Sequence, residues 1–214
     1  MLRLAVLASG RGSNFQAIID ARDSGALNVD IVCLLTDNPN AYAIKRAIDN
    51  NIPHICINPR QYADRDEFFK AIADELSARS TELIALAGFM RIVTSPLIEV
   101  FPMRILNIHP ALLPSFKGLH AQRQAIEAGV KIAGCTVHFV DEGMDTGPII
   151  VQAPVPVTSD DDEETLSEKI LRSEHVIYPY AIRLFAEGRL QVNNGIVRIE
   201  QSRSSQSLGP TDGK

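Results

Sequence analysis

The sequence predicts an α/β protein with a doubly wound, mostly parallel sheet that has helices on both faces. Near-continuous apolar runs recur through the first two-thirds of the chain, and amphipathic segments separate them. The runs do not alternate apolar and polar residues, which is typical of strands buried on both faces. In the last third, two strand-like runs are joined by a short connector, which favours antiparallel pairing. The C-terminal part is therefore expected to add antiparallel strands and a long helix to the parallel sheet.

The first half of the chain predicts five strands and three helices, with one helix after each of the first three strands. Each apolar run is short, and the run over residues 29–36 is rich in β-branched residues, whereas the segments between the runs have helical spacing. The expected strands cover residues 2–8, 29–36, 52–57, 82–87 and 104–109, and the expected helices cover residues 15–22, 41–51 and 64–79.

The C-terminal part predicts two antiparallel strands over residues 131–140 and 148–157, followed by a helix over 162–188. Pro179 is expected to kink or interrupt this helix. A small hairpin is expected around Asn194-Gly195. Residues 1–200 are predicted to form a single domain, and the Ser-, Gly- and Gln-rich residues 201–214 a disordered polar tail.

The composition excludes several classes of protein. The chain has 214 residues with 26 acidic and 21 basic side chains, a balance that argues against a nucleic-acid-binding surface. No apolar run is long enough to span a membrane, and the first residues enter a strand rather than a signal peptide. Cys33, Cys56 and Cys135 are predicted to be buried thiols in a reducing compartment, so a cytoplasmic location is expected.

A glycine-rich loop, Ser9-Gly10-Arg11-Gly12-Ser13-Asn14, follows the first predicted strand and precedes a helix. Ligands of open α/β sheets bind at this edge, and the N–H groups at a helix start bind anions such as phosphate. The third glycine of a dinucleotide fingerprint is replaced by Phe15, and no Gly-Lys-Ser/Thr follows. The loop therefore predicts either a site for a terminal phosphate or a tight turn capped by Ser13 or Asn14.

Asn107 and His109 lie two residues apart at the end of the fifth predicted strand, so their side chains share a face. A carboxamide N–H can stabilise a developing oxyanion, and an imidazole can transfer a proton near neutral pH. The pair suits acyl transfer, although a capping asparagine and a structural histidine would give the same pattern.

An acidic connector over residues 141–147 follows a strand that ends at Val140. A carboxylate brought beside His109 would raise the pKa of the imidazole and yield a general acid. The residues alone leave open which of Asp141, Glu142 and Asp145 reaches the histidine, or whether the segment is only a solvated turn.

No metal site is predicted, because the five histidines lack the spacing of known ligand motifs. His120 and His138 are interpreted as hydrogen-bonded structural residues, and either could lie near the cleft.

Four segments together resemble the phosphoribosylglycinamide formyltransferase family of purine biosynthesis. They are S-G-R-G-S-N at 9–14, L-A-G-F-M-R-I-V at 86–93, L-N-I-H-P-A-L-L-P-S-F-K-G at 106–118 and D-T-G-P-I-I at 145–150. The resemblance extends over about residues 1–200 in the expected order. Asn-x-His-Pro is shared with related formyl-folate enzymes, whereas the Gly-Ser-Asn loop in a short chain points to the glycinamide branch.

The resemblance implies transfer of a formyl group from the co-substrate 10-formyltetrahydrofolate to the amine of glycinamide ribonucleotide, without a metal. It implies small-molecule substrates, no nucleic acid or membrane partner, and a monomer or homodimer. Its residue assignments, carried over by motif, are Asn107, His109 and Asp145 as the catalytic residues, Gly12, Ser13, Asn14 and Glu174 as the ribonucleotide site, and Arg65, Met90, Arg91, Ile92, Val93 and Asn107 as the folate site.

Three other readings stay open from the sequence. A formyltetrahydrofolate hydrolase would carry an additional N-terminal regulatory domain, whereas the first predicted strand here begins at Leu2. A methionyl-tRNA formyltransferase would need a further RNA-binding domain and a basic surface. A non-catalytic dinucleotide-binding module would use Asp37 as its ribose-binding acid, but the missing third glycine argues against it.

Overall fold

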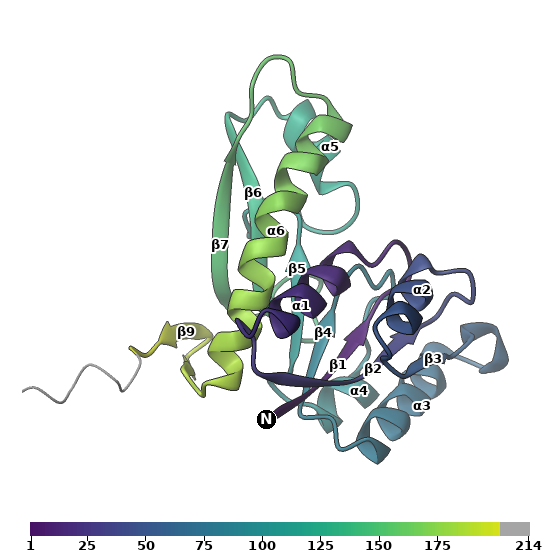
Figure 1. Cartoon of the computed structure of the whole chain (residues 1–214). Coiled ribbons are helices and arrows are strands. Elements are labelled where there is room, and N and C mark those ends of the chain that lie inside the picture. Colours follow the sequence, from purple (N-terminus) through teal and green to yellow (C-terminus); the bar gives the residue numbers. More distant parts are fainter. Residues whose placement is uncertain (202–214) are drawn as a thin grey trace, which may run out of the picture.

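A computed structural model describes residues 1–201, and its main feature is a seven-stranded, mostly parallel sheet (Figure 1). The strand order is β3-β2-β1-β4-β5-β6-β7, in which the first five strands are parallel and the last two pair antiparallel. The strands are β1 Leu2–Leu7, β2 Val29–Thr36, β3 His54–Cys56, β4 Leu83–Leu86, β5 Ile105–His109, β6 Ile132–Phe139 and β7 Ile149–Pro156. The predicted fold class is confirmed.

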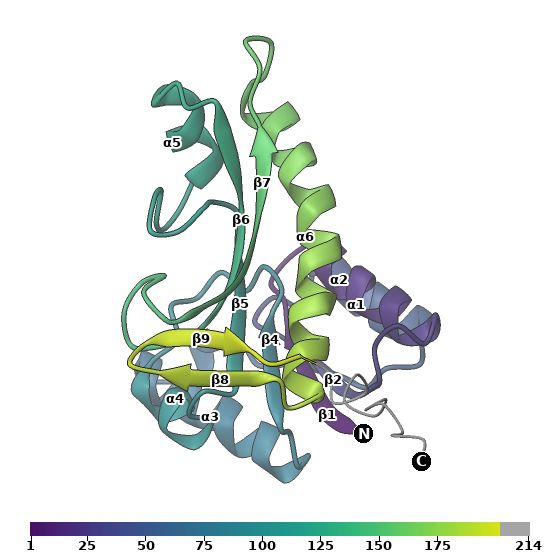
Figure 2. The same ribbon diagram turned by 90° about the vertical axis from the view of Figure 1, so that its left-hand side faces the viewer.

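Helices cover both faces of this sheet, as the view in Figure 2 shows. They are α1 Ser13–Asp23, α2 Tyr42–Asp49, α3 Arg65–Ala78, α4 Ser95–Val100, α5 Ala121–Glu127 and α6 Glu163–Ala186, with a short 3-10 turn at Pro59–Gln61. The packing of β1 on both faces explains why residues 4–7 are all apolar. Leu4 and Val6 pack with α1 and α6, whereas Ala5 and Leu7 pack with α3 and α4 on the opposite face.

The strands β6 and β7 run together with α6 away from the parallel part of the molecule (Figures 1 and 2). Asp162 caps α6 in a capping box with Thr165, and Glu163 and Glu164 suit the positive end of the helix. The Tyr178 hydroxyl donates to the carbonyls of Leu86 and Leu106, both at 3.0 Å, and so holds α6 against β4 and β5. The hairpin β8 Leu190–Asn193 and β9 Ile196–Ile199 follows α6.

Several predictions differ from the structure in detail. The helix α6 passes through Pro179 without interruption, and the short helices α4 and α5 were not predicted. Cys33 and Cys135 are buried as predicted, but Cys56 is exposed, because β3 is a short strand at the edge of the sheet. Apart from Gln201, the predicted polar tail lies outside the described residues. Within residues 1–201, no helix is both long and apolar enough to cross a membrane.

Candidate active site

The candidate site lies at the carboxyl ends of β1, β4 and β5, where the loops that follow these strands meet. The glycine loop, defined as residues 9–14, is joined to the loop after β4 by two hydrogen bonds. The Ser9 N–H donates to the Gly88 carbonyl at 3.1 Å, and the Met90 N–H donates to Ser9 Oγ at 2.9 Å. In turn, β4 pairs with β5 so that Leu86 lies beside Asn107. The sheet therefore brings three loops that are distant in sequence to one edge.

The glycine loop ends in a left-handed residue that starts α1. Gly12 is the N-cap of α1 and has a φ of 66°, a conformation that favours glycine. A Cβ at this position would lie 2.8 Å from Ala43 Cβ, so the loop also packs closely against α2. The cap uses no side-chain hydrogen bond, and the first N–H groups of a helix lack carbonyl partners within it. This arrangement suits an anion rather than a Ser or Asn cap.

Asn14 joins the glycine loop to α6. Its Nδ2 donates to Glu174 Oε2 at 2.7 Å, and both side chains are buried. Burial raises the pKa of Glu174, and the hydrogen bond from Asn14 offsets only part of this effect. The Oδ1 atom of Asn14 is buried without a hydrogen-bond partner. A buried carboxyl group and an unsatisfied amide oxygen are typical of a site that a polar ligand completes.

Asn107 and His109 lie at the carboxyl end of the strand β5, as predicted. His109 is almost fully buried, whereas Asn107 is half-buried. The Nε2 atom of His109 lies 2.8 Å from the Phe116 carbonyl oxygen. Since a carbonyl only accepts hydrogen bonds, Nε2 carries a proton in this structure.

Asp145 reaches His109 from the connector between β6 and β7. Its Oδ2 atom lies 3.4 Å from His109 Nδ1 and accepts a hydrogen bond from the Gly118 N–H at 2.8 Å. The connector begins beside the start of β5, because Phe139 pairs with Leu106, and it then folds back toward His109. Asp145 has a φ of 52°, in the left-handed region. The structure therefore brings together the amide, imidazole and carboxyl groups that the sequence placed on two distant segments.

The other two acids of the connector have different partners. Asp141 Oδ1 accepts hydrogen bonds from the Gly143 N–H and the Thr146 hydroxyl, so it orders the connector itself. Glu142 accepts a hydrogen bond from the Ser95 hydroxyl at 3.2 Å. The question that the sequence left open is thus answered in favour of Asp145.

His138 belongs to the same group of side chains. It lies opposite Asn107 in the β5–β6 pair, and the Asn107 Nδ2 atom is 3.2 Å from its Nε2 atom. Its Nδ1 atom lies 2.7 Å from the Phe139 carbonyl, so the proton of the neutral ring is on Nδ1 and Nε2 accepts from Asn107. Asp145 Oδ1 approaches His138 Nε2 to 3.6 Å. We call Asn107, His109, His138 and Asp145 the histidine cluster.

The electrostatics of the histidine cluster differ from the sequence prediction in one respect. Burial lowers the pKa of His109 and outweighs the Phe116 carbonyl and the Asp145 carboxylate, which both act to raise it. The carboxylate therefore acts in the predicted direction, but burial outweighs it and the pKa of His109 is lowered overall. Burial acts to raise the pKa of Asp145, but polar contacts of the carboxylate, among them the hydrogen bond from the Gly118 N–H, outweigh it and lower the pKa, so Asp145 is ionised.

The segment from Met90 to Val93 forms the part of the site on the β2 side. Met90 and Ile92 are exposed, whereas Val93 is buried. Arg65, at the start of α3, donates from Nη2 to the Ile92 carbonyl at 2.7 Å, and Arg91 donates from Nε to Asp37 Oδ2 at 2.7 Å. Two guanidinium groups thus accompany an exposed apolar strip. Asp37 is ion-paired with Arg91 through Oδ2.

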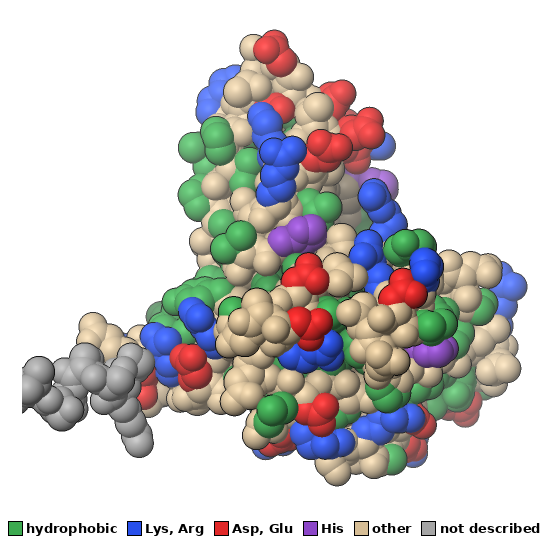
Figure 3. Space-filling view, in the orientation of Figure 1, with side chains coloured by type: hydrophobic (Ala, Val, Ile, Leu, Met, Phe, Trp, Pro, Cys, Tyr) green, Lys and Arg blue, Asp and Glu red, His purple; other side chains and the backbone are tan. Residues whose placement is uncertain are grey.

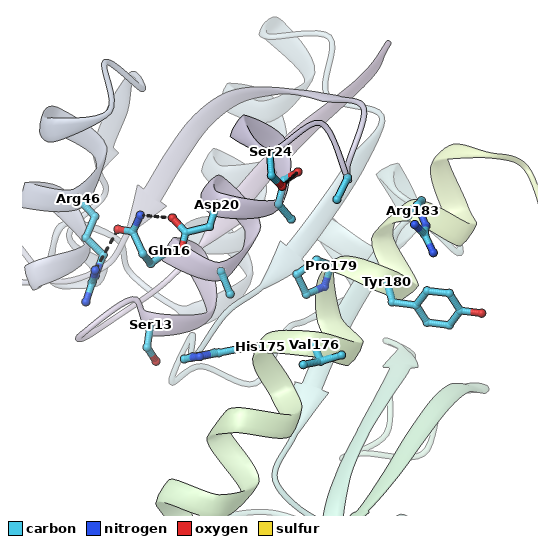
Figure 4. Close-up of a pocket in the computed structure, with 13 residues that line it drawn as sticks. Ser13, Gln16, Asp20, Ser24, Arg46, His175, Val176, Pro179, Tyr180 and Arg183 are labelled. Atoms are coloured by element: carbon cyan, nitrogen blue, oxygen red, sulfur yellow. Dashed lines mark hydrogen bonds between the residues drawn. The ribbon is translucent and has the colours of Figure 1, made fainter.

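A cavity of about 780 Å³ runs from the start of α1 along the groove between α1 and α6 (Figure 4). Ser13 and His175 lie at one end of it, and Tyr180 and Arg183 at the other. On the face shown in Figure 3, basic and acidic side chains are interspersed and form no continuous basic stripe. Within residues 1–201, no group of three or more His, Cys, Asp or Glu side chains is placed to hold a metal ion.

Sequence reasoning missed the active-site contacts that depend on pairing register and loop path. His138 was interpreted as structural, yet it contacts Asn107 and Asp145. Only the register of β6 against β5 brings it there, and no local motif encodes that register. The Phe116 carbonyl and the Gly118 N–H are backbone groups, so their roles carry no residue signature.

Three comparisons relate this geometry to known proteins. A family model described as formyl transferase matches residues 2–182. A phosphoribosylglycinamide formyltransferase of Bacillus subtilis is 44% identical over 183 residues, which are 86% of this chain and 94% of that protein. The crystal structure of glycinamide ribonucleotide transformylase 1 from Symbiobacterium toebii has a TM-score of 0.93 and 50% identity, covering 94% of this chain and 95% of that one.

The similarity extends to parts of longer proteins. The trifunctional purine biosynthetic protein adenosine-3 of Drosophila melanogaster is 46% identical over 188 residues, which are 87% of this chain. These residues are only 14% of that protein, so the chain corresponds to one segment of it.

Proposed function

Because the chain belongs to the formyl transferase family, we propose that it transfers the formyl group of 10-formyltetrahydrofolate to the primary amine of glycinamide ribonucleotide, a step of purine biosynthesis. The observation that carries the proposal is the convergence of Asn107, His109 and Asp145 at the sheet edge that also holds the glycine loop. One edge thus offers an anion site and an acyl-transfer site. Residues 1–200 act in this proposal as a single domain.

The glycine loop binds the phosphate of the ribonucleotide in this proposal. Gly12, Ser13 and Asn14 supply N–H groups at the positive end of α1, which favours a dianionic phosphate. Glu174 then contacts the sugar or the glycinamide part, because its carboxyl group lies next to Asn14 and its burial leaves acceptor capacity for a ligand.

The folate binds along the segment from Met90 to Val93. The exposed side chains of Met90 and Ile92 offer apolar contact for a flat ring system. Arg65 and Arg91, each held by one hydrogen bond, bind the acidic part of the folate. Asn107 lies beside Leu86, four residues before Met90, so the reacting carbon of a folate bound here would lie close to the histidine cluster.

The reaction proceeds by direct attack. The amine nitrogen forms a bond to the formyl carbon, and the carbonyl oxygen becomes an oxyanion in the tetrahedral intermediate. The bond from this carbon to the folate nitrogen then breaks, and the proton lost by the attacking nitrogen passes to the leaving nitrogen. The formylated product and tetrahydrofolate balance the atoms, and no oxidant or reductant is needed.

The histidine cluster stabilises the oxyanion in two ways. His138 accepts one Asn107 Nδ2–H and so fixes the carboxamide with its amide nitrogen toward β6, which leaves the second N–H for the oxyanion. The Nε2–H of His109, which contacts the Phe116 carbonyl, exchanges this acceptor for the oxyanion. Asp145 lies beside Nδ1 and favours the imidazolium, in which both ring nitrogens carry protons, and this protonated form stabilises the oxyanion.

An absorbance assay tests the proposal. The purified chain is mixed with 10-formyl-5,8-dideazafolate, with and without glycinamide ribonucleotide, and deformylation of the folate analogue is followed. A change that requires the ribonucleotide supports the transferase. A change that does not require it would instead identify a hydrolase, and the absence of any change would contradict both enzymes in favour of a binding module.

A further inference from the structure

Two carbonyl groups of the glycine loop accept hydrogen bonds from the helix α2. The Ala43 N–H donates to the Gly10 carbonyl at 3.1 Å, and Arg46 Nε donates to the Arg11 carbonyl at 2.9 Å. In a planar trans peptide, the N–H points opposite to the carbonyl of the preceding residue. The Gly12 N–H therefore points away from Arg46. The bond from Arg46 thus fixes the direction in which the loop presents this donor.

Arg46 is itself held in one position by three contacts. Its Nη1 donates to Gln16 Oε1 at 2.9 Å, in addition to the bond from Nε to the loop. Its guanidinium carbon lies 5.1 Å from the ring centroid of Tyr42, one turn earlier in α2. Gln16 in turn donates to Asp20 at 2.8 Å. The planar fork of one arginine therefore joins the loop to the first turn of α1 through two separate nitrogen atoms, whereas a lysine has all its donors on one nitrogen.

The same guanidinium group borders the cavity at the end where an anion would bind. Arg46, Gln16, Ser13 and His175 all line the cavity, and Figure 4 shows the Arg46–Gln16 hydrogen bond on the side of α1 that faces α2. A permanent positive charge thus lies behind the positive end of α1. Both charges favour the ionised form of a phosphate ester.

From these contacts we propose that Arg46 is the positioning residue of the phosphate site. It holds the Arg11 carbonyl away from the ligand, keeps the Gly12 N–H directed at the phosphate, and adds positive charge behind the loop. The inference rests on the proposed function in that Gly12, Ser13 and Asn14 bind the phosphate of the substrate. It extends that function to a residue on α2 that touches neither substrate.

Steady-state kinetics of Arg46→Met test the proposal, with Lys45→Met as the matched control. Lys45 is the neighbouring cation on α2, but it is exposed and pairs only with Asp49 among the described residues. Loss of one charge-assisted interaction corresponds to a rise of about tenfold in the KM for the ribonucleotide. The kcat and the KM for the folate are expected to stay within about twofold of the wild type on the same reasoning. Lys45→Met leaves all three constants unchanged.

A second measurement does not depend on turnover. Inorganic phosphate is titrated into the ¹⁵N-labelled chain, and the amide signals of Gly12, Ser13 and Asn14 are followed by NMR. The wild type and Lys45→Met are expected to bind phosphate equally, and Arg46→Met about tenfold more weakly. Arg46→Lys keeps the charge but loses the fork, so its affinity should lie between the two.

The two measurements separate the failure of this inference from the failure of the proposed function. A wild type that binds phosphate at the loop but transfers no formyl group contradicts the function, while the titration still decides the role of Arg46. Equal phosphate affinity of wild type and Arg46→Met overturns the inference, as does a wild type that does not bind phosphate at the loop. If Arg46→Met does not fold, the same comparison is made with Arg46→Lys, and equal affinity there overturns the positioning role.

Discussion

The glycine loop and the histidine cluster lie at the same edge of the sheet but are built in different ways. The glycine loop is one continuous segment, and its donors are backbone N–H groups at the start of α1. The histidine cluster takes its side chains from β5, β6 and the connector after β6, which are up to 38 residues apart between Asn107 and Asp145. The first region can be recognised from six adjacent residues, whereas the second exists only in the folded chain.

The two regions also differ in how charge is handled. The loop offers fixed dipoles that do not titrate, so its affinity for an anion depends on geometry. The histidine cluster places the Asp145 carboxyl group 3.4 Å from the His109 imidazole, so the protonation states of these two groups depend on each other. We therefore expect substitutions in the loop to change KM and substitutions in the cluster to change kcat.

The largest expected effect is on turnover when His109 is replaced by Ala. The variant loses a donor to the oxyanion, so kcat should fall by about 10²–10³, or roughly 3–4 kcal/mol of transition-state stabilisation. Asp145→Ala should reduce kcat by a similar order, because the imidazole loses the carboxylate beside Nδ1. His54→Ala is the control, since His54 is exposed on the short strand β3. Circular dichroism checks the fold, and near-normal kcat in either variant would refute the catalytic assignment.

A smaller effect is expected on binding when Asn14 is replaced by Ala. The loop loses a side-chain donor and Glu174 loses its hydrogen bond, which should raise the KM for the ribonucleotide by about tenfold. The kcat should change far less than in His109→Ala. Ser24→Ala, just beyond the opposite end of α1, serves as the control because its hydroxyl only contacts the Ala21 carbonyl. An unchanged KM would contradict the phosphate site, and a loss of kcat alone would remove the distinction between the two regions.

The same contrast explains what the sequence could predict. The parallel order of the first strands follows from apolar runs that alternate with helices, and the structure confirms it. Asn107 and His109 were placed on one face by the two-residue period of a strand. The residues alone could not choose among Asp141, Glu142 and Asp145, because the choice depends on a connector that folds back on itself, and Asp145 came only from the family resemblance.

The errors have physical causes of the same kind. A carboxylate of the connector was expected to raise the pKa of His109, and Asp145 acts in that direction, whereas the burial that outweighs it is a property of the packed fold. The short helices α4 and α5, with six and seven residues, offer too few turns for a helical period to emerge. Pro179 does not interrupt α6, and the burial of Tyr178 and Ile182 on either side of it favours a continuous helix.

The smallest expected effect concerns stability and lies at Glu174, the α6 residue that accepts a hydrogen bond from Asn14 of the glycine loop. This carboxyl group is buried and its pKa is raised above the ordinary value of 4.5. Between 4.5 and the folded-state pKa, the folded chain keeps a proton that the unfolded chain releases, so stability falls as the pH rises through this window. Glu174→Gln removes the ionisation but keeps an oxygen that accepts from Asn14 Nδ2. The variant should gain on the order of 1 kcal/mol at neutral pH and lose activity.

The pH dependence of that gain distinguishes titration of Glu174 from a change in packing. Urea unfolding of the wild type and Glu174→Gln should give equal free energies of unfolding below pH 4.5, where Glu174 is protonated in both states. The difference should then grow with pH and level off above the folded-state pKa. Glu168→Gln, on the same helix but exposed, should show no such growth. A gain that is constant at all pH values would mean that ionisation of Glu174 does not destabilise the fold. The burial of Glu174 would then be no evidence for a ligand site.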